Sequence, residues 1–321
     1  MLTLPSLREP QAIHDVSVTI GSYCLRIKDL TFFSSRWGND AGFMNIMERM
    51  LRQQLENLRV FIFSDKSSHT LATAAFMRHS EALCRVEFPS CRAIKSSTLH
   101  AILVSCRALE ILNVGGFSSI RTALTLEDAV EVEWVCAKIR HLEITVSLTP
   151  DGKDPAYLAD PTKATWTEQD HRHWEMMDKF YTQIGYLKDL QILSLKSTDV
   201  KLPSLEDLYD PFRKLCLPGL LALEDATTGQ VGFLSRWSEL SQLQELTGSF
   251  LWTNTEAVAR MGDQEVEWFA THLPALRSAA FVNVRCENGG LADNLPRTLH
   301  ELHRRRPEIQ FDYNADVPAM F

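Results

Sequence analysis

The sequence predicts an α/β fold: an irregular leucine-rich-repeat solenoid, or horseshoe, with a parallel sheet on its concave side and helices on its convex side. Three observations support this prediction. The motif L-x-x-L-x-L recurs along the chain, the intervals between its copies are similar, and helical patterns lie between the copies. We therefore expect residues 1–321 to form a single repeat domain of about ten repeats.

The predicted strands coincide with the copies of the motif. The clearest copies run from Leu109 to Val114 and from Leu190 to Leu195. Successive copies are 31, 25, 26, 30, 51, 30, 23, 33 and 33 residues apart, and the 51-residue step contains a polar segment that we interpret as an inserted loop at 149–170. We expect the N-terminus to begin within the repeat array. The remaining copies are looser and begin at Ile27, Leu58, Leu83, Ile139, Leu220, Leu243 and Leu276, with a degenerate terminal copy at Ile309.

Helices are predicted between these strands, where apolar residues recur at a spacing of three and four. One of them opens at Thr125 with a capping-box pattern. Strands that alternate with helices in this way form parallel sheets. The other predicted helices span residues 41–58, 67–79, 96–106, 167–187, 262–273 and 295–305.

A candidate binding surface follows from the alternation of side chains along a strand. In L-x-x-L-x-L the leucines point inward, so the residues between them face the concave side. This row is acidic toward its C-terminal half, which suggests a basic partner segment. Trp37 and Trp252 follow repeat strands and are candidate contacts at the rim. The predicted concave row consists of Asp29, Thr31, Val60, Ile62, Arg85, Glu87, Asn113, His141, Glu143, Ser194, Lys196, Glu224, Glu245 and Thr247.

Composition argues against several classes of protein. The formal net charge is −8, which disfavours nucleic acid as a partner. No apolar run is long enough for a membrane helix, and the N-terminus lacks a signal-peptide pattern. The seven cysteines are widely spaced and never form C-x-x-C, which is typical of free thiols in a reducing compartment. We therefore expect an intracellular protein, cytoplasmic or nuclear.

The sequence contains no established catalytic signature, so we predict a protein that is not an enzyme and has no cofactor or metal. The most metal-like cluster surrounds His171 and His173. A metal-dependent or hydrolytic enzyme built around the inserted loop is the rival hypothesis, and a structural repeat remnant without a partner is another. The basic run from His303 to Arg306 is either an anion-binding or localisation signal or a set of cations at the end of a helix.

Several phrases also resemble fungal F-box/leucine-rich-repeat (RNI-like) proteins. They include the segment that begins at Leu103, the segment from Val132 to Leu142 and the segment that begins at Ile184. Glu131-Val-Glu-Trp134 is echoed by Glu265-Val-Glu-Trp268, each before a repeat strand. The resemblance covers residues 20–313 and implies the substrate-recognition arm of an SCF-type, cullin-based ubiquitin ligase.

The chain departs from that family in one respect. An F-box needs a helical N-terminal segment, and too few residues separate Pro5 from the predicted strand at Ile27. We therefore expect a cullin-ligase adaptor as partner only if an F-box exists outside this chain. The partner expected on the concave face is another protein.

Overall fold

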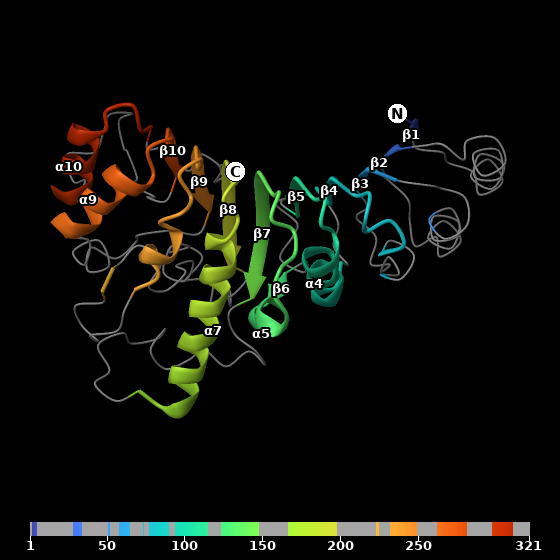
Figure 1. Cartoon of the computed structure of the whole chain (residues 1–321), viewed down its shortest axis with the longest axis horizontal. Helices are drawn as coiled ribbons and strands as arrows, with labels where there is room; N and C mark the ends of the chain where they lie inside the picture. Colours follow the sequence, from blue (N-terminus) through green and yellow to red (C-terminus); the bar gives the residue numbers. More distant parts are fainter. Residues whose placement is uncertain are drawn as a thin grey trace, which may run out of the picture. The chain divides into compact units, whose positions relative to one another are not determined.

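The computed structural model describes residues 2–4, 28–33, 51, 58–64, 73, 77–89, 94–114, 123–147, 166–197, 223–224, 232–248, 262–280 and 297–310. Its helices and parallel strands give an α/β fold, as predicted (Figure 1). The chain forms two compact units, Met1–Thr145 and Val146–Phe321. In the described part, none of the helices combines the length and the apolar character needed to cross a membrane.

The strands of the first unit follow one another in the sheet in the order of the sequence. Each strand along this order pairs in parallel with the next. One of them, at residues 2–4, was not predicted, because the first recognisable copy of the motif begins only at Ile27. The order is β1 (Leu2–Leu4), β2 (Asp29–Phe33), β3 (Val60–Ser64), β4 (Arg85–Glu87), β5 (Ile111–Asn113) and β7 (His141–Ser147), and β6 (Leu124–Thr125) pairs with β7.

A ladder of buried apolar residues crosses these strands. The residues are direct partners on neighbouring strands, and none of their side chains is exposed. Because side chains alternate along a strand, the residues on either side of each ladder position face the opposite side of the sheet. The inward positions of the motif are thus confirmed in this unit. The ladder consists of Leu30, Phe61, Val86, Leu112 and Leu142.

A recurring backbone contact links each repeat to the next. The carbonyl of Arg59 accepts hydrogen bonds from the amides of Cys84 and Arg85, at 2.9 and 3.1 Å. The carbonyl of Cys84 accepts in the same way from Glu110 and Ile111, at 2.7 and 3.0 Å. Such bonds do not depend on side-chain identity, so they fix the register of the strands while leaving the outward residues free to vary.

Two helices of the first unit lie beside each other in Figure 1. α4 (Ser96–Ser105) agrees with the predicted helix at 96–106. α5 (Leu126–Glu131) begins after Thr125, whose hydroxyl accepts a hydrogen bond from the amide of Asp128 at 3.2 Å, as expected of an N-cap. The predicted helices at 41–58 and 67–79 lie almost wholly outside the described residues.

The second unit contains strands in the order β8-β9-β10, with a further parallel bridge between Ser278 and Gln310. Leu193, Leu246 and Ala279 are its buried ladder. The predicted helices at 167–187, 262–273 and 295–305 are confirmed with shifts of a few residues. The elements are α7 (Glu168–Gly185), β8 (Ile192–Ser197), the 3-10 helix η4 (Leu234–Trp237), β9 (Glu245–Gly248), α9 (Asp263–His272), β10 (Ser278–Ala280) and α10 (Arg297–Arg305).

The predicted repeat strand that begins at Leu220 lies mostly outside the described residues, which include only Leu223 and Glu224 of this copy, and its expected place between β8 and β9 is wrong. β8 pairs directly with β9, so no strand lies between them. Leu223 instead donates its amide to the buried carboxylate of Glu265, at 3.1 Å.

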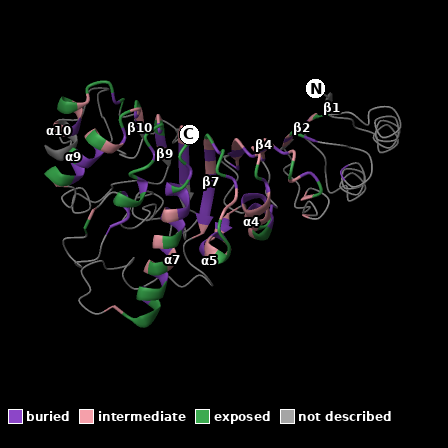
Figure 2. Ribbon diagram, viewed as in Figure 1, coloured by how far each residue is buried: buried purple, intermediate pink, exposed green. Residues whose placement is uncertain are grey.

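Aromatic residues join α7 to the segment of η4. Phe233 lies 4.6 Å from Trp174 and 4.8 Å from Tyr181, measured between ring centroids. Tyr181 also meets Trp237 edge-on at 6.1 Å. Buried and exposed residues alternate along α7, as Figure 2 shows by colour.

Candidate interaction surface

The outward residues of the first unit form two parallel rows across the sheet. They come from successive strands at matching register, one residue before and one residue after each position of the buried ladder. We call these ten residues the open face. The first row is Asp29, Val60, Arg85, Ile111 and His141, and the second is Thr31, Ile62, Glu87, Asn113 and Glu143.

The open face is a surface rather than a second core. Arg85 is exposed and Thr31 is buried, and the other eight residues are partly exposed. The inward ladder, in contrast, is completely buried. One side of this sheet is therefore covered, and the other is accessible to contacts.

Five residues that the sequence predicted for binding meet on three strands that are neighbours in this sheet. Arg85 and Glu87 lie on β4, Asn113 lies on β5, and His141 and Glu143 lie on β7. Arg85 Nε forms an ion pair with Glu87 Oε1 on its own strand. His141 Nε2 lies 4.0 Å from Glu143 Oε2.

Ile111 is missing from the predicted concave row, although it occupies the same position as Arg85 and His141 on the strand between them. The alternation rule that placed Asn113 in this row also places Ile111 there, two residues earlier in the same copy. Its partly exposed side chain adds an apolar contact to a row that is otherwise polar on β4 and β7.

The remaining predicted site residues are dispersed. Glu245 is exposed on β9, and Lys196 lies on β8. Glu224 is exposed but belongs to an isolated bridge outside the paired strands. Trp37 and Trp252 lie outside the described residues.

The expected acidic bias toward the C-terminal half therefore does not hold for the described strands. Asp29, Glu87 and Glu143 lie on the open face of the first unit, whereas β8 to β10 contribute Glu245. The bias had depended on Glu224, which is not on a paired strand.

The cluster around His171 does not assemble into a site in the described part of the chain. His171 and Glu175 are exposed on α7, whereas His173 is buried. Residues two apart on a helix point in different directions, which explains this separation. Among the described residues, no group of three or more His, Cys, Asp or Glu side chains could hold a metal ion.

The described cysteines are free, and two of them are core residues. Cys106 and Cys136 are fully buried, and desolvation by burial raises the pKa of each thiol to about 12. Such thiols carry almost no thiolate at neutral pH and are poor nucleophiles. Cys84 is partly exposed, and its thiol lies 3.4 Å from the carbonyl of Arg59. Cys91 lies outside the described residues.

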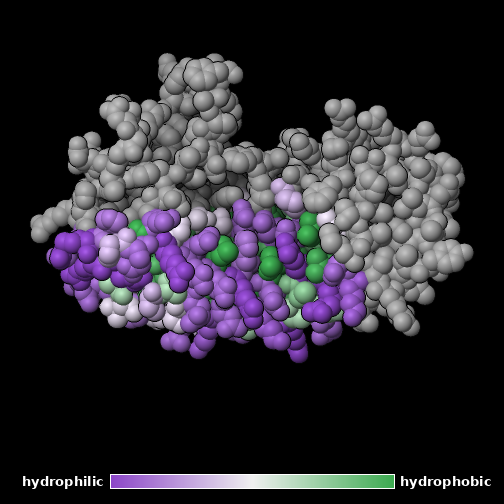
Figure 3. Space-filling model, turned by 90° about the horizontal axis from the view of Figure 1, so that it is seen from above, coloured by the Kyte–Doolittle hydropathy of each residue, from purple (hydrophilic) through white to green (hydrophobic). Residues whose placement is uncertain are grey.

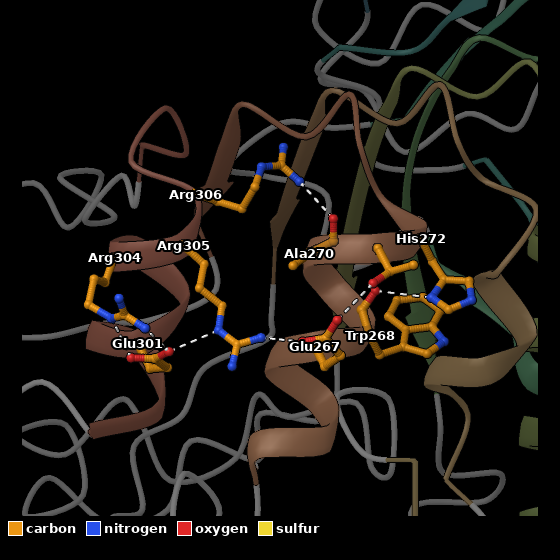
Figure 4. A network of polar contacts seen from close by, with 9 residues as sticks. Glu267, Trp268, Ala270, His272, Glu301, Arg304, Arg305 and Arg306 are labelled. Atoms are coloured by element: carbon orange, nitrogen blue, oxygen red, sulfur yellow. Dashed lines mark hydrogen bonds and ion pairs between the residues drawn. The ribbon is translucent and has the colours of Figure 1, made fainter.

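The basic run at the end of α10 is occupied by contacts within the second unit, as Figure 4 shows. Arg304 and Arg305 both bind Glu301, and Arg305 also pairs with Glu267 on α9. These hydrogen bonds, with Arg304 the larger contributor, lower the pKa of Glu301 to about 2.

Arg306 makes a different set of contacts, with backbone carbonyls. Its guanidinium donates to Ala270 and Leu273 through Nη1, at 3.5 and 3.2 Å, and to Pro274 and Leu276 through Nη2, both at 3.1 Å. These carbonyls lie at and just beyond the C-terminal end of α9, where a cation is favourable. The contacts support the structural interpretation of the basic run.

Seen from above, the described residues form a mainly hydrophilic surface on which hydrophobic residues appear as separate spots (Figure 3). Among those residues, the large hydrophobic side chains that are exposed are Val132 and Tyr186, at 50% and 66%. The open face is therefore the best-defined candidate surface, because it combines regular geometry with polar and apolar side chains.

Comparison with known proteins adds no identity. The chain matches no protein-family model and has no significant match among curated proteins.

Proposed function

We propose that this chain is a protein-binding module, an irregular leucine-rich-repeat solenoid whose open face contacts a protein partner. The observation that carries the proposal is the pair of outward rows in the first unit. Their regular register offers side chains at intervals of about 4.8 Å, the spacing of neighbouring strands. An extended surface of this kind suits a macromolecule better than a small metabolite.

The proposal extends to the role that the sequence resemblance implies. We infer an intracellular protein, cytoplasmic or nuclear, that recognises substrates for an SCF-type ubiquitin ligase, rather than an enzyme in its own right. The buried free thiols Cys106 and Cys136 support a reducing compartment. This extension requires an F-box elsewhere in the native gene product. Co-purification of the native protein with a cullin adaptor would support the extension, and its absence would limit the proposal to the binding module.

Site-specific photo-crosslinking tests the binding module itself. A photoreactive amino acid replaces Asn113 on the open face, and a matched variant carries it at Ser97, an exposed residue of α4. In extract of the native cell, the Asn113 position should crosslink a defined protein that the Ser97 position does not reach. Crosslinks to the same proteins from both positions, or from Ser97 alone, would contradict the proposal.

A further inference from the structure

The open face has an excess of negative charge. Asp29, Glu87 and Glu143 contribute three carboxylates, and Arg85 contributes one guanidinium. The aspartate, glutamate and arginine side chains of the face therefore sum to two net negative charges. Surfaces with one predominant sign select partners of the opposite sign and accelerate their association.

The two glutamates of the second row are partly removed from water. Only 15% of the Glu87 side chain and 20% of the Glu143 side chain are exposed. Asn113 lies on the strand between them and is the register partner of both. Their Cα atoms are therefore about 10 Å apart at the usual strand spacing. A cation that reaches such carboxylates is screened less than it would be at a fully exposed site.

Apolar side chains lie beside this row. Val60 and Ile62 are on β3, and Ile111 is on β5, all partly exposed. They offer contact area to the aliphatic stem of a long basic side chain or to its neighbours in a peptide. Nucleic acid fits this face poorly, because its phosphates would meet carboxylates.

We propose that the partner docks a lysine or arginine side chain of an extended protein segment against Glu87, Asn113 and Glu143, with an adjacent apolar residue on Val60, Ile62 or Ile111. This inference rests on the proposed function and specifies its partner chemistry. A basic side chain complements the net negative charge of the open face, and its apolar neighbour covers the apolar side chains beside the row. An arginine would add paired hydrogen bonds to a carboxylate.

A displayed library of random peptides, selected on the whole purified chain, tests the inference. Selected peptides should be enriched in lysine or arginine next to an apolar residue. Combining Glu87→Gln with Glu143→Gln keeps the side-chain shape and removes the two charges. It should weaken binding of the selected peptides about tenfold or more. The matched control combines Glu81→Gln with Glu133→Gln, which makes the same charge change at exposed positions of the same unit outside the strands.

A third variant, Asn113→Trp, separates the two proposals, because it obstructs the open face without changing its charge. The charge inference is wrong if the selected peptides lack basic residues. It is also wrong if they bind the paired glutamine variant as well as the parent but do not bind Asn113→Trp. In that second case the open face remains a binding surface. If their binding is insensitive to Asn113→Trp, both proposals fail. Recovery of no enriched peptide also counts against both. Unchanged circular dichroism and melting temperature would show that each variant is folded.

Discussion

Replacing Gly185 with alanine should destabilise the second unit, because the last residue of α7 has no room for a methyl group. A Cβ atom at this position would lie 2.1 Å from the carbonyl oxygen of Arg236 and 3.1 Å from its carbonyl carbon. Arg236 belongs to η4, so the obstacle is backbone and cannot rotate away. Its side chain is also held by Asp178, through bonds of 2.8 and 3.2 Å.

The sign of the effect discriminates between two physical terms. Helix propensity alone would make the alanine variant more stable by up to about 1 kcal/mol. Relief of the clash requires α7 and η4 to separate by about 1 Å, and overpacking of this kind costs about 1–3 kcal/mol. Trp237 and Tyr181 are buried near the contact between Gly185 and the Arg236 backbone, and their packing opposes the separation of α7 from η4. We therefore expect a net loss of about 1–2 kcal/mol.

Urea unfolding followed by circular dichroism and tryptophan emission measures this loss. Gly262→Ala is the matched control, because its nearest obstacle is Oε2 of Glu265 at 3.2 Å, the end of a side chain. We expect the control to lose less than about 1 kcal/mol, as helix N-cap substitutions from glycine do. An alanine variant at Gly185 that is as stable as the parent, or more stable, would refute the proposed packing of α7 on η4.

Three further predictions concern the core, one histidine and the basic run. Leu112→Ala should lower the free energy of unfolding by about 2–5 kcal/mol, because this leucine is fully buried. Asn113→Ala should lower it by less than about 1 kcal/mol, because the asparagine is partly exposed. Equal losses in urea titrations would contradict the assigned faces of the sheet. Burial lowers the pKa of His79 from 6.5, and this effect is larger than the opposing effect of its hydrogen bond to the Leu51 carbonyl. As the pH falls, the unfolded chain therefore takes up a proton at His79 before the folded chain does, and the free energy of unfolding should decrease below about pH 6.5. His79→Leu should flatten this dependence of stability on pH. Arg306→Ala and Arg306→Lys should each lower the free energy of unfolding by about 1–3 kcal/mol, because neither retains the guanidinium that donates to four carbonyls. If thermal unfolding shows that the lysine variant is as stable as the parent, the positive charge alone is enough.

The strands could be predicted from the sequence because their signal is local. The motif predicts that Leu109, Leu112 and Val114 are buried, and the structure buries all three. The same pattern misled at Leu220, because β8 pairs directly with β9 and leaves no place for a strand between them. The strand at 2–4 has only three residues and lies ahead of Pro5, too short for a recognisable period.

The contacts of Arg306 and the close approach at Gly185 could not be predicted in the same way. Arg306 binds carbonyls 30 to 36 residues away in the chain, and every residue has a carbonyl. Gly185 meets the backbone of Arg236, and a backbone obstacle has no residue type to recognise. Sequence therefore indicates which residues turn inward, while the meeting of distant backbone segments needs the structure.

The inward ladder and the open face of the first unit contribute differently to folding, and this difference bears on function. Folding of the first unit relies on the inward ladder and on backbone bonds that any residue could make. The fold therefore places no requirement for carboxylates on Glu87 or Glu143. Partial burial of these side chains costs desolvation, which Arg85 beside Glu87 and His141 beside Glu143 offset in part. A basic partner side chain would add a further opposite charge beside these carboxylates on binding, as expected of a face that serves recognition.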